Sequence, residues 1–262
     1  MSLDLDRYFE RVGAGPVETD LSGLARLHAA HLAAIPFENI DVWLGRDIQL
    51  DLDSLERKLV RGRRGGYCFE HNTLFAAVLR QVGFEVSTLE ARVRPPGATE
   101  PLPRTHMVLV VTIAGRRWLA DVGFGGDGPL EPVTIDGEES EQADAAYRVE
   151  EELDAVSVLR RCSREGWRDL YAFSTRPALP IDFEVANHYT STHPSSVFRR
   201  TLTVQRSDGE GRRILRGRSY TLRRGSEEER REIAPNELGD LLTRDFGLGL
   251  RTSEAIALEA LV

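Results

Sequence analysis

The chain of 262 residues is poor in cysteine, with only Cys68 and Cys162. Two cysteines cannot form the disulfide framework of a small secreted scaffold, so we expect a protein of a reducing compartment. The sequence also lacks an apolar run of bilayer length, and the longest, residues 108–114, suits a buried strand. Its first residues, MSLDLDRYFERVG, lack the cationic start and apolar stretch of a signal peptide. We therefore expect a cytoplasmic protein with no membrane partner.

An excess of positive charge is missing as well. Acidic residues outnumber Lys and Arg by 42 to 34, for a net charge of −8, which argues against a protein whose whole surface binds nucleic acid. Hydrophobic residues make up 41% of the chain and charged residues 29%, so burial can offset chain entropy and wholesale disorder is excluded. Because no internal repeat and no low-complexity linker separates its parts, we expect them to pack against each other.

The hydrophobic pattern changes twice along the chain and predicts three parts, residues 1–84, 85–188 and 189–262. In the first, helical spacing runs from Leu5 to Val12, from an Asp20 or Ser22 cap to Pro36, from Ser54 to Leu59 and from Cys68 to Val82, where Gly83 ends the helix. The second part is rich in predicted strands, at 84–94, 106–113, 116–122, 146–149, 155–161 and 167–173. The third is mixed, with strands predicted at 197–205, 212–216 and 218–223 and helices at 230–233 and 236–246.

Two stretches concentrate charge of one sign. Residues 136–154 hold nine acids against one Arg and read as a solvated loop or hairpin tip. Residues 199–224 hold nine Arg against Asp208 and Glu210, a local net charge of +7. This basic stretch is consistent either with attraction of an anionic cofactor or acyl-carrier surface, or simply with solvated strand faces.

Cys68 stands at the first turn of a predicted helix, directly after a loop rich in Arg and Gly. Free backbone N–H groups and the helix dipole stabilise an anion at such a position, and the arginines within residues 61–64 add positive potential. The glycine pair at 65–66 leaves space over the sulfur. This context makes Cys68 a candidate nucleophile. The alternative, a small buried hydrophobe, is the default for Cys162 in its strand-like run.

A thiol nucleophile needs a base, and the base needs a group that orients it. Of the six histidines, His106 begins the most β-rich strand. If Ala114–Gly115 form a two-residue hairpin turn, Asp121 lies opposite Val108 and is the diagonal neighbour of His106, about 7 Å away between Cβ atoms. A register error of one residue would put the two side chains on opposite faces. Taken singly, Asp121 can also be interpreted as an acid at a strand end, and His106 as a core histidine.

These residues lie in motifs that resemble those of the arylamine N-acetyltransferases. Residues 64–72, RGGYCFEHN, are similar to that family's nucleophile signature R-G-G-x-C-x-E-x-N. Residues 105–106 and 121–126, TH and DVGFGG, resemble its histidine and aspartate motifs. Residues 35–39 and 193–198, IPFEN and HPSSVF, provide further matches. The resemblance spans nearly the whole chain, with the motifs in the same order.

The resemblance implies an α+β fold. An N-terminal helical bundle would carry Cys68, a central antiparallel β-barrel would carry His106 and Asp121, and a C-terminal α/β lid would follow, in a cysteine-protease-like arrangement. The implied activity is transfer of an acetyl group from the cosubstrate acetyl-CoA to an arylamine, arylhydrazine or N-hydroxyarylamine. Transfer would pass through an acetyl-cysteine at Cys68, with His106 as the base and Asp121 as its orienting group.

The resemblance also points to contacts with the two substrates. An apolar wall for the aromatic substrate would consist of Phe37, Val93, Phe124 and Phe198. Coenzyme contacts would come from Thr105, Phe124, Gly125 and Gly126, with the glycine N–H groups facing phosphates. Ordinary core packing explains the apolar residues equally well, and a plain turn explains the glycine pair.

Several other functions fit the same residues. An amide synthase of the same family would move a polyketide chain from a carrier protein, and a papain- or transglutaminase-like hydrolase would use the same order of Cys, His and Asp. A non-catalytic binding protein could retain the scaffold. A metal site at Cys68 and His71 lacks a second ligand pair at suitable spacing, so we expect no metal.

Overall fold

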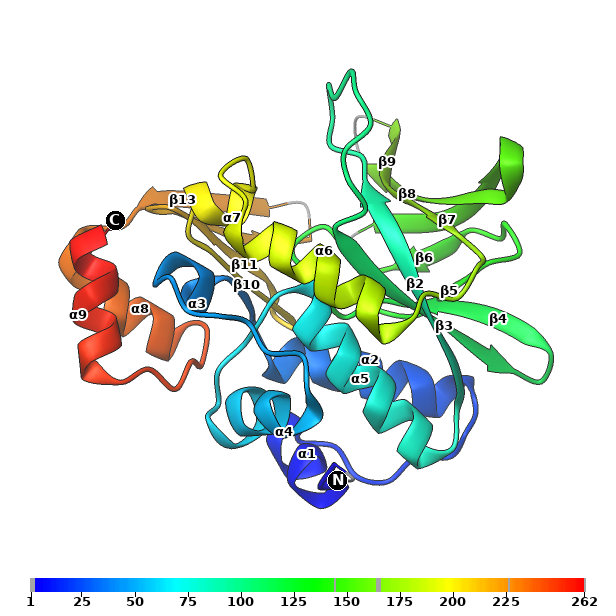
Figure 1. The fold of residues 1–262 in the computed structure, drawn as a ribbon, viewed down its shortest axis with the longest axis horizontal. Helices are drawn as coiled ribbons and strands as arrows, with labels where there is room; N and C mark the ends of the chain where they lie inside the picture. The colour runs from blue at the N-terminus through cyan, green and yellow to red at the C-terminus, as the bar shows by residue number, and fades with distance from the viewer. Residues whose placement is uncertain (1–2, 144, 164–165, 226, 262) are drawn as a thin grey trace.

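The fold is α+β, with helices packed beneath two antiparallel sheets (Figure 1). The computed structural model describes residues 3–143, 145–163, 166–225 and 227–261. Within them the strands form one sheet of eight, curled into a nearly closed barrel, and one sheet of five. The predicted α+β class is therefore confirmed.

The N-terminal third is mainly helical, and caps set the helix ends. Asp20 begins one helix by accepting the Gly23 N–H at 2.8 Å, and Gly83 ends another in the left-handed region, both as predicted. A third helix begins earlier than predicted, because Asp51 accepts the N–H of Ser54 at 2.9 Å. The elements are α1 (Leu5–Val12), α2 (Leu21–Ala34), α3 (Ile40–Trp43), α4 (Leu52–Leu55), the π-helical η1 (Glu56–Arg61) and α5 (Cys68–Val82).

The barrel follows in the chain and contains all the strands predicted for the middle part. Its strands are β2 (Glu85–Val93), β3 (His106–Ile113), β4 (Arg116–Ala120), β5 (Val133–Thr134), β6 (Ser140–Gln142), β7 (Ala145–Glu152), β8 (Val156–Ser163) and β9 (Gly166–Ser174), with a 3-10 turn η2 (Leu153–Ala155). The order β5-β4-β3-β2-β9-β8-β7-β6 brings β5 back against β7. The acidic stretch 136–154 is thus only partly loop, because Tyr147 and Val149 of β7 are buried in the barrel core.

The hairpin between β3 and β4 has the register predicted from its turn. Ala114 and Gly115 both have positive φ, at 49° and 79°, which is the two-residue turn that matches the twist of a hairpin. Ile113 pairs with Arg116, and the same register continues to the end of β4. Asp121, the next residue after β4, therefore leaves the hairpin close to the start of β3.

The C-terminal part differs from its predicted elements in three places. A helix spans residues 180–192, where the sequence pattern predicted none, and Asp182 accepts the N–H of Leu179 at its start. Residues 197–200 are helical rather than extended, because Ser196 caps them. Residues 230–233, predicted as helix, mostly pair with β12 as an edge strand.

The elements here are α6 (Pro180–Thr192), α7 (Val197–Arg200), β10 (Thr203–Asp208), β11 (Gly211–Arg216), β12 (Ser219–Arg224), β13 (Glu227–Glu232), η3 (Pro235–Glu237), α8 (Leu238–Arg244) and α9 (Thr252–Leu261). The five-stranded sheet has the order β1-β10-β11-β12-β13, so β1 (Phe37–Glu38) joins it from the N-terminal part. The division at 84/85 and 188/189 stays a prediction, and α6 runs across the second boundary.

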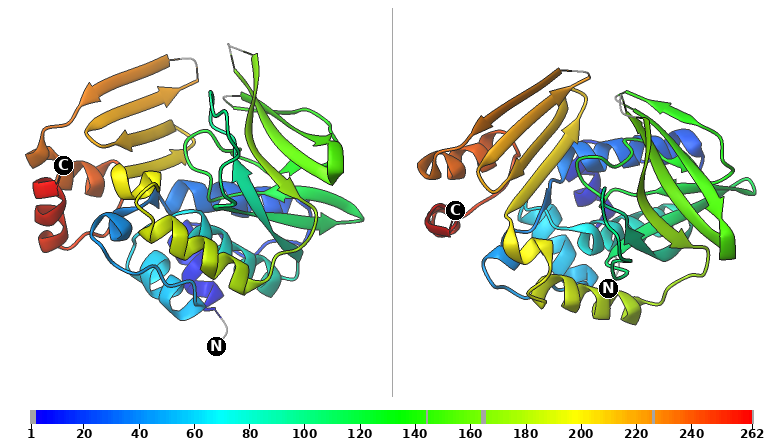
Figure 2. Two further views of the ribbon diagram at one scale, coloured as in Figure 1. Left: turned by 45° about the horizontal axis from the view of Figure 1, so that its top comes forward. Right: turned by 90° about the horizontal axis from the view of Figure 1, so that it is seen from above.

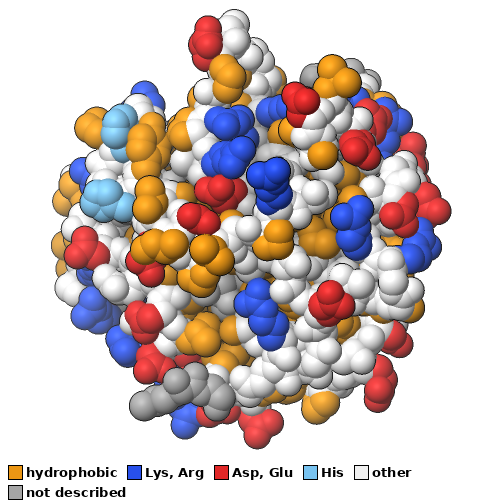
Figure 3. Space-filling model, turned by 45° about the vertical axis from the view of Figure 1, so that its right-hand side comes forward, with side chains coloured by type: hydrophobic (Ala, Val, Ile, Leu, Met, Phe, Trp, Pro, Cys, Tyr) orange, Lys and Arg blue, Asp and Glu red, His pale blue; other side chains and the backbone are white. Residues whose placement is uncertain are grey.

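The barrel and the five-stranded sheet stand side by side over the helices (Figure 2). The loop after β4 joins them, because Asp127 pairs with Arg168 of β9 at 2.9 Å and with Arg223 of β12 at 3.0 Å. On the face in Figure 3, acidic and basic side chains are interspersed with apolar ones. Among the described residues, no helix has the length and apolarity that crossing a bilayer requires.

Three histidines are fully buried beside the helical core. His28 of α2 donates from Nδ1 to Leu130 O and accepts the Asp121 N–H at Nε2, which ties α2 to the barrel. Burial lowers the pKa of His28 and of His71 to about 4, although backbone carbonyls act in the opposite direction. Burial also lowers the pKa of His31 well below its ordinary value. All three rings are therefore uncharged at neutral pH.

These histidines should make the fold sensitive to mild acid. In the unfolded chain they take up protons below about pH 6.5, while in the folded protein they resist until about pH 4, so stability is lost as pH falls between these values. We expect each of His28 and His71 to lower the free energy of unfolding by on the order of 3 kcal/mol across this window. Urea unfolding of the wild type and of His28→Gln at pH 7, 6 and 5 measures the difference.

The wild type must be compared with the variant because burial also raises the pKa of Glu70 to about 7. Protonation of Glu70 increases the free energy of unfolding as pH falls, which opposes the effect of the histidines. The His28→Gln variant should lose stability less steeply on acidification than the wild type. Parallel curves for the two proteins would contradict the assignment.

Candidate active site

Cys68 is the first residue of α5, and its side chain is only 3% exposed. The Sγ atom lies 3.6 Å from the backbone oxygen of Thr105, directly before β3. Cys68 thus lies at the start of a helix, as predicted, and its sulfur faces the residue that precedes β3. Cys162 lies in β8, away from this group, and both cysteines are free.

Buried ion pairs hold the loop that precedes Cys68. Arg64 pairs with Glu38 at 2.7 Å and contacts Glu254 of α9 at 3.4 Å. Lys58 lies 2.7 Å from both Asp41 and Glu70. Glu70 in turn accepts the N–H of Tyr67 at 3.1 Å, which caps α5. The charge of Arg64 is thus taken up by carboxylates, and its role here is to fix the loop rather than to face the sulfur.

Two glycines allow the close approach of this loop to its neighbours. A Cβ atom on Gly65 would lie 1.9 Å from the oxygen of Pro36, in the segment before β1. A Cβ atom on Gly123 would lie 2.8 Å from the Cα of Cys68. Both contacts are with backbone, which cannot move aside. A larger residue at 65 would push the segment before β1 away from the nucleophile loop, and one at 123 would push the loop after β4 away from the nucleophile.

His106 and Asp121 meet as the hairpin register predicts. His106 Nε2 and Asp121 Oδ2 are 2.7 Å apart, and both side chains are buried. The other carboxylate oxygen, Oδ1, accepts from Asn72 Nδ2 and from the Gly123 N–H, each at 2.9 Å. Cys68 lies close enough to His106 to help raise the pKa of the ring. Because Nε2 is engaged by Asp121, Nδ1 is the ring nitrogen left for the sulfur.

The electrostatics of this group favour a charged imidazole. Burial would lower the pKa of His106, but the Asp121 carboxylate and the hydrogen bonds to Asp121 and Cys68 outweigh it and raise the pKa to about 10. Burial opposes the charge on Asp121 too, yet His106, Asn72 and the Gly123 N–H together hold its pKa below the ordinary value. A carboxylate and an imidazolium thus stabilise each other in a buried site.

Sequence reasoning missed some residues that complete this arrangement. Asn72 also donates to Met107 O at 2.6 Å, so it joins α5 to β3, and its position four residues after Cys68 on one helix face was the available signal. Tyr171 packs its ring 4.9 Å from that of His106 and is fully buried. Only the tertiary pairing of β9 with β2 brings Tyr171 there, so no local pattern pointed to it.

The four predicted wall residues fall into two groups. Phe37 and Phe198 contact each other with ring centroids 5.8 Å apart. Phe124 lies edge-on to His106 at 5.3 Å. Val93 is half-buried at the end of β2 and pairs with Tyr171, and Phe37 lies close to Gly125 beside Phe124.

The glycine loop, residues 123–128 after β4, already forms hydrogen bonds with side chains of the five-stranded sheet. The Gly126 N–H donates to the side chain of Gln205, and Arg212 donates to the oxygens of Gly126 and Gly128 at 2.7 and 2.8 Å. A phosphate on the Gly126 N–H would therefore have to displace Gln205. Gly125 has a φ of 87°, which only glycine adopts readily.

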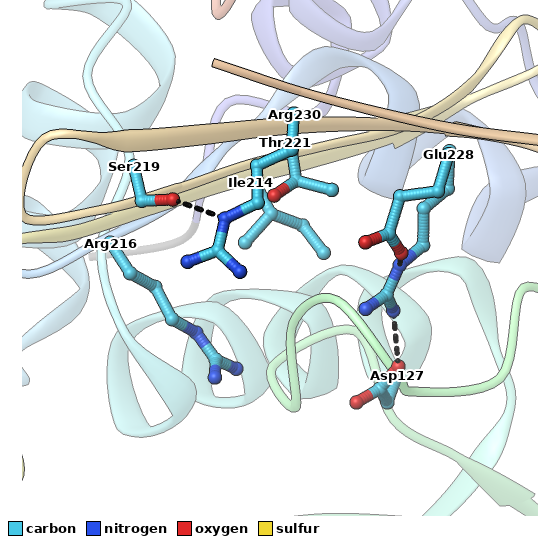
Figure 4. A pocket seen from close by; sticks show the side chains of 8 residues that line it. Asp127, Ile214, Arg216, Ser219, Thr221, Glu228 and Arg230 are labelled. Atoms are coloured by element: carbon cyan, nitrogen blue, oxygen red, sulfur yellow. Dashed lines mark hydrogen bonds and ion pairs between the residues drawn. The ribbon is translucent and has the colours of Figure 1, made fainter. Parts of the chain in front are cut away.

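A basic pocket of about 170 Å³ opens next to this loop (Figure 4). Asp127 forms one side, and residues of β11, β12 and β13 form the other. Arg230 donates to Ser219 at 2.8 Å, and Arg216 extends into the same space. Within the described residues no carboxylate pairs with Arg216 or Arg230, whereas Arg223 is neutralised by Asp127 and Glu228. The lining therefore has a net charge of +1, with three arginines against Asp127 and Glu228.

Metal ligation has no support in the part of the chain that the structure describes, where no cluster of three candidate ligands occurs. His71 contacts His31 through Nδ1 and Pro36 O through Nε2. Neither ring nitrogen is thus available for a metal shared with Cys68.

Comparison with known proteins agrees with these features. The family model described as N-acetyltransferase matches residues 20–255. The arylamine N-acetyltransferase of Mycolicibacterium smegmatis is 40% identical over 258 residues, which cover 95% of this chain and 94% of the relative. A Salmonella typhimurium protein named arylamine N-acetyltransferase / N-hydroxyarylamine O-acetyltransferase is 36% identical, covering 95% and 90%.

A solved structure gives the same result for the fold. The arylamine N-acetyltransferase of Mycobacterium marinum in complex with CoA superposes with a TM-score of 0.92 at 34% identity, covering 98% of each chain. The amide synthase, hydrolase and binding-protein alternatives find no support in these comparisons. The chain belongs to the N-acetyltransferase family, with the arylamine N-acetyltransferases as its relatives.

Proposed function

We propose that this protein transfers an acetyl group from acetyl-CoA to arylamines, arylhydrazines or N-hydroxyarylamines by a ping-pong mechanism. The observation that carries the proposal is the buried pair of His106 and Asp121, with Nε2 and Oδ2 2.7 Å apart, beside the Cys68 sulfur, which lies 3.6 Å from the oxygen of Thr105, the residue before His106. The names of the relatives support the acceptor class, and the CoA complex of the Mycobacterium marinum protein supports the donor.

In the first half-reaction, the Cys68 thiolate attacks the thioester carbon of acetyl-CoA. The C–S bond to the coenzyme breaks, and its sulfur takes the proton from the His106 imidazolium, giving acetyl-Cys68, free CoA and neutral His106. The Cys68 N–H, in the first turn of α5, is our candidate donor to the oxyanion. Because one thioester replaces another, the step is close to balanced in energy and the intermediate persists until an acceptor arrives.

In the second half-reaction, the amine nitrogen attacks the acetyl carbon. His106 takes the amine proton, the C–S bond to Cys68 breaks, and the thiolate–imidazolium pair is restored. Aromatic amines suit this step because they are largely unprotonated at neutral pH. We propose that Phe37, Val93, Phe124 and Phe198 hold the aromatic ring, since Phe37 contacts Phe198 and Phe124 borders His106.

For the coenzyme, we propose that Thr105, Phe124, Gly125 and Gly126 line the path to the sulfur and that the basic pocket holds phosphate groups. Thr105 O lies 3.6 Å from the Cys68 sulfur, and Ile214 of the pocket lies beside Gly126, so the pocket borders the loop after β4. Arg216 and Arg230 supply the positive charge that phosphates require. We further propose a cytoplasmic location, where acetyl-CoA is available and both free cysteines stay reduced.

Replacing the nucleophile should abolish the covalent intermediate. After incubation with acetyl-CoA alone, intact-protein mass spectrometry should detect one acetyl group on the wild type and none on Cys68→Ser. The matched control is Cys162→Ser, which alters the other free cysteine and should be acetylated like the wild type. Acetylation of Cys68→Ser to the extent seen in the wild type would contradict the proposed mechanism.

Replacing the orienting carboxylate should remove the charge from His106. In Asp121→Asn, burial is no longer opposed by the carboxylate, so the pKa of His106 falls and the ring is neutral at pH 7. We expect the rate of CoA release to fall roughly a thousandfold or more, the scale typical of triad aspartates. The control is Asp136→Asn, an exposed acid paired with Arg116, which should leave the rate unchanged. Near-normal turnover of Asp121→Asn would refute the role of the pair.

Removing the charges of the basic pocket should weaken binding of acetyl-CoA. We expect Arg216→Ala and Arg230→Ala each to raise the KM for acetyl-CoA about tenfold with little change in kcat, as for the loss of one charge-assisted hydrogen bond. With S-acetylpantetheine, which has no phosphates, both variants should match the wild type. The control is Arg244→Ala, an exposed arginine of α8. Equal losses with both donors would show that the pocket does not bind phosphates.

A further inference from the structure

A line of buried polar groups runs from α1 through α2 and α5 to the segment before β1. The Tyr8 hydroxyl lies 2.9 Å from His31 Nδ1, and His31 Nε2 lies 2.9 Å from His71 Nδ1. His71 Nε2 then lies 3.1 Å from the oxygen of Pro36. All three side chains are fully buried. None of the catalytic steps derived above uses this line, although His71 lies one turn after Cys68 on α5.

The chemistry of its last member fixes the direction of the whole line. The Pro36 oxygen can only accept, so His71 carries its proton on Nε2 and accepts at Nδ1. His31 must then donate from Nε2 and accept at Nδ1, and the Tyr8 hydroxyl is the donor that remains. Every nitrogen of both rings is used once. The tautomers of two histidines therefore depend on a single carbonyl, next to the proposed acceptor wall.

That carbonyl belongs to the segment which docks on the nucleophile loop. Pro36 O also accepts the N–H of Gly66 at 3.4 Å, and the Glu38 N–H donates to Gly66 O at 2.7 Å. Phe37 lies between these two contacts. Its ring stacks on that of His71, with centroids 6.3 Å apart and an interplanar angle of 17°. One side chain of α5 thus contacts both the backbone before Phe37 and its aromatic face.

The helix that carries the nucleophile therefore also sets the position of one wall residue. Cys68 and His71 lie one turn apart on α5, and the helix is rigid. The distance from the Cys68 sulfur to Phe37 is therefore set by the helix and by the contacts of His71. His106 and Asp121 are positioned separately, by Asn72, by Gly123 and by the β3–β4 hairpin. Disturbing the line of histidines should move Phe37 and leave the Cys68–His106 contact in place.

We propose that His71 is a positioning residue for the acceptor amine, because it fixes the Pro36 carbonyl and the Phe37 ring relative to Cys68. The inference rests on the proposed function and on the contact of Phe37 with the acceptor. Its consequence is a separation of the two half-reactions. The acetylation of Cys68 by acetyl-CoA depends little on His71, whereas the discharge of acetyl-Cys68 to an arylamine depends on it strongly.

The test measures the two half-reactions separately in the full-length chain. The first is CoA release from acetyl-CoA without acceptor, and the second is discharge of the isolated acetyl-enzyme by increasing concentrations of 4-methoxyaniline. In His71→Leu, we expect the arylamine concentration for half-maximal discharge to rise about tenfold, because loss of a positioning contact weakens acceptor binding. CoA release should stay within about threefold of the wild type.

A conservative variant and a packing control separate positioning from general damage. In His71→Gln, the amide N–H can donate to Pro36 O and the amide oxygen can accept from His31, so acceptor binding should recover to within about threefold. Phe75→Leu alters another buried ring of α5, 5.2 Å from His31, and removes no hydrogen bond. It should lower the melting temperature without changing the arylamine dependence.

The outcomes distinguish this inference from the proposed function. Equal effects of His71→Leu and Phe75→Leu on arylamine dependence would overturn it, as would a loss of CoA release as large as the loss of discharge. If His71→Leu does not fold, Tyr8→Phe is the alternative variant, because it removes the first donor of the line. It should raise the arylamine concentration for half-maximal discharge by a smaller factor, and no change in that concentration would overturn the inference. A wild-type protein that never acetylates arylamines would instead overturn the proposed function.

Discussion

The chemistry of this protein depends on a carboxylate that is kept ionised where water does not reach it. Asp121 is buried, and isolation of that kind ordinarily neutralises an acid. Three donors prevent this: the His106 ring, the Asn72 amide and the Gly123 N–H. Each donor comes from a different part of the molecule, namely the barrel, the helix of the nucleophile and the glycine loop. Asp121 is therefore held ionised only when these three elements are assembled around it.

A second set of buried charges holds the loop before Cys68 in place. Arg64, Lys58 and the carboxylates around them connect the loop before Cys68 to β1, α5 and α9. Buried ion pairs add little net stability, because desolvation offsets their attraction, but the loss of one partner leaves an uncompensated charge. Such a cluster favours one arrangement of the loop over its alternatives. The position of the sulfur is thus defined by charges that do not take part in the reaction.

Local signals in the sequence predicted the parts of the fold that local chemistry decides. The end of α5 follows from Gly83, and the β3–β4 register follows from the Ala114–Gly115 turn, so Asp121 and His106 could be paired in advance. Helix α6 was missed because Ile181 and Val185 point to solvent, at 56% and 68% exposure, which obscures its period. The edge strand β13 contains only charged residues, so nothing in its own pattern indicated pairing with β12. Tyr171 and the partners of Arg64 required the tertiary structure.

The two-residue strand β1 has a consequence for the order in which the molecule can assemble. Phe37 and Glu38 pair with Gln205 and Val204, across most of the length of the chain. A nascent chain emerging from the ribosome exposes the nucleophile segment long before β10 exists to hold β1. Contacts so distant in sequence form late and slow the folding of a domain. The thiol therefore gains its finished surroundings only near the end of synthesis, so an incomplete chain carries the cysteine without its completed site.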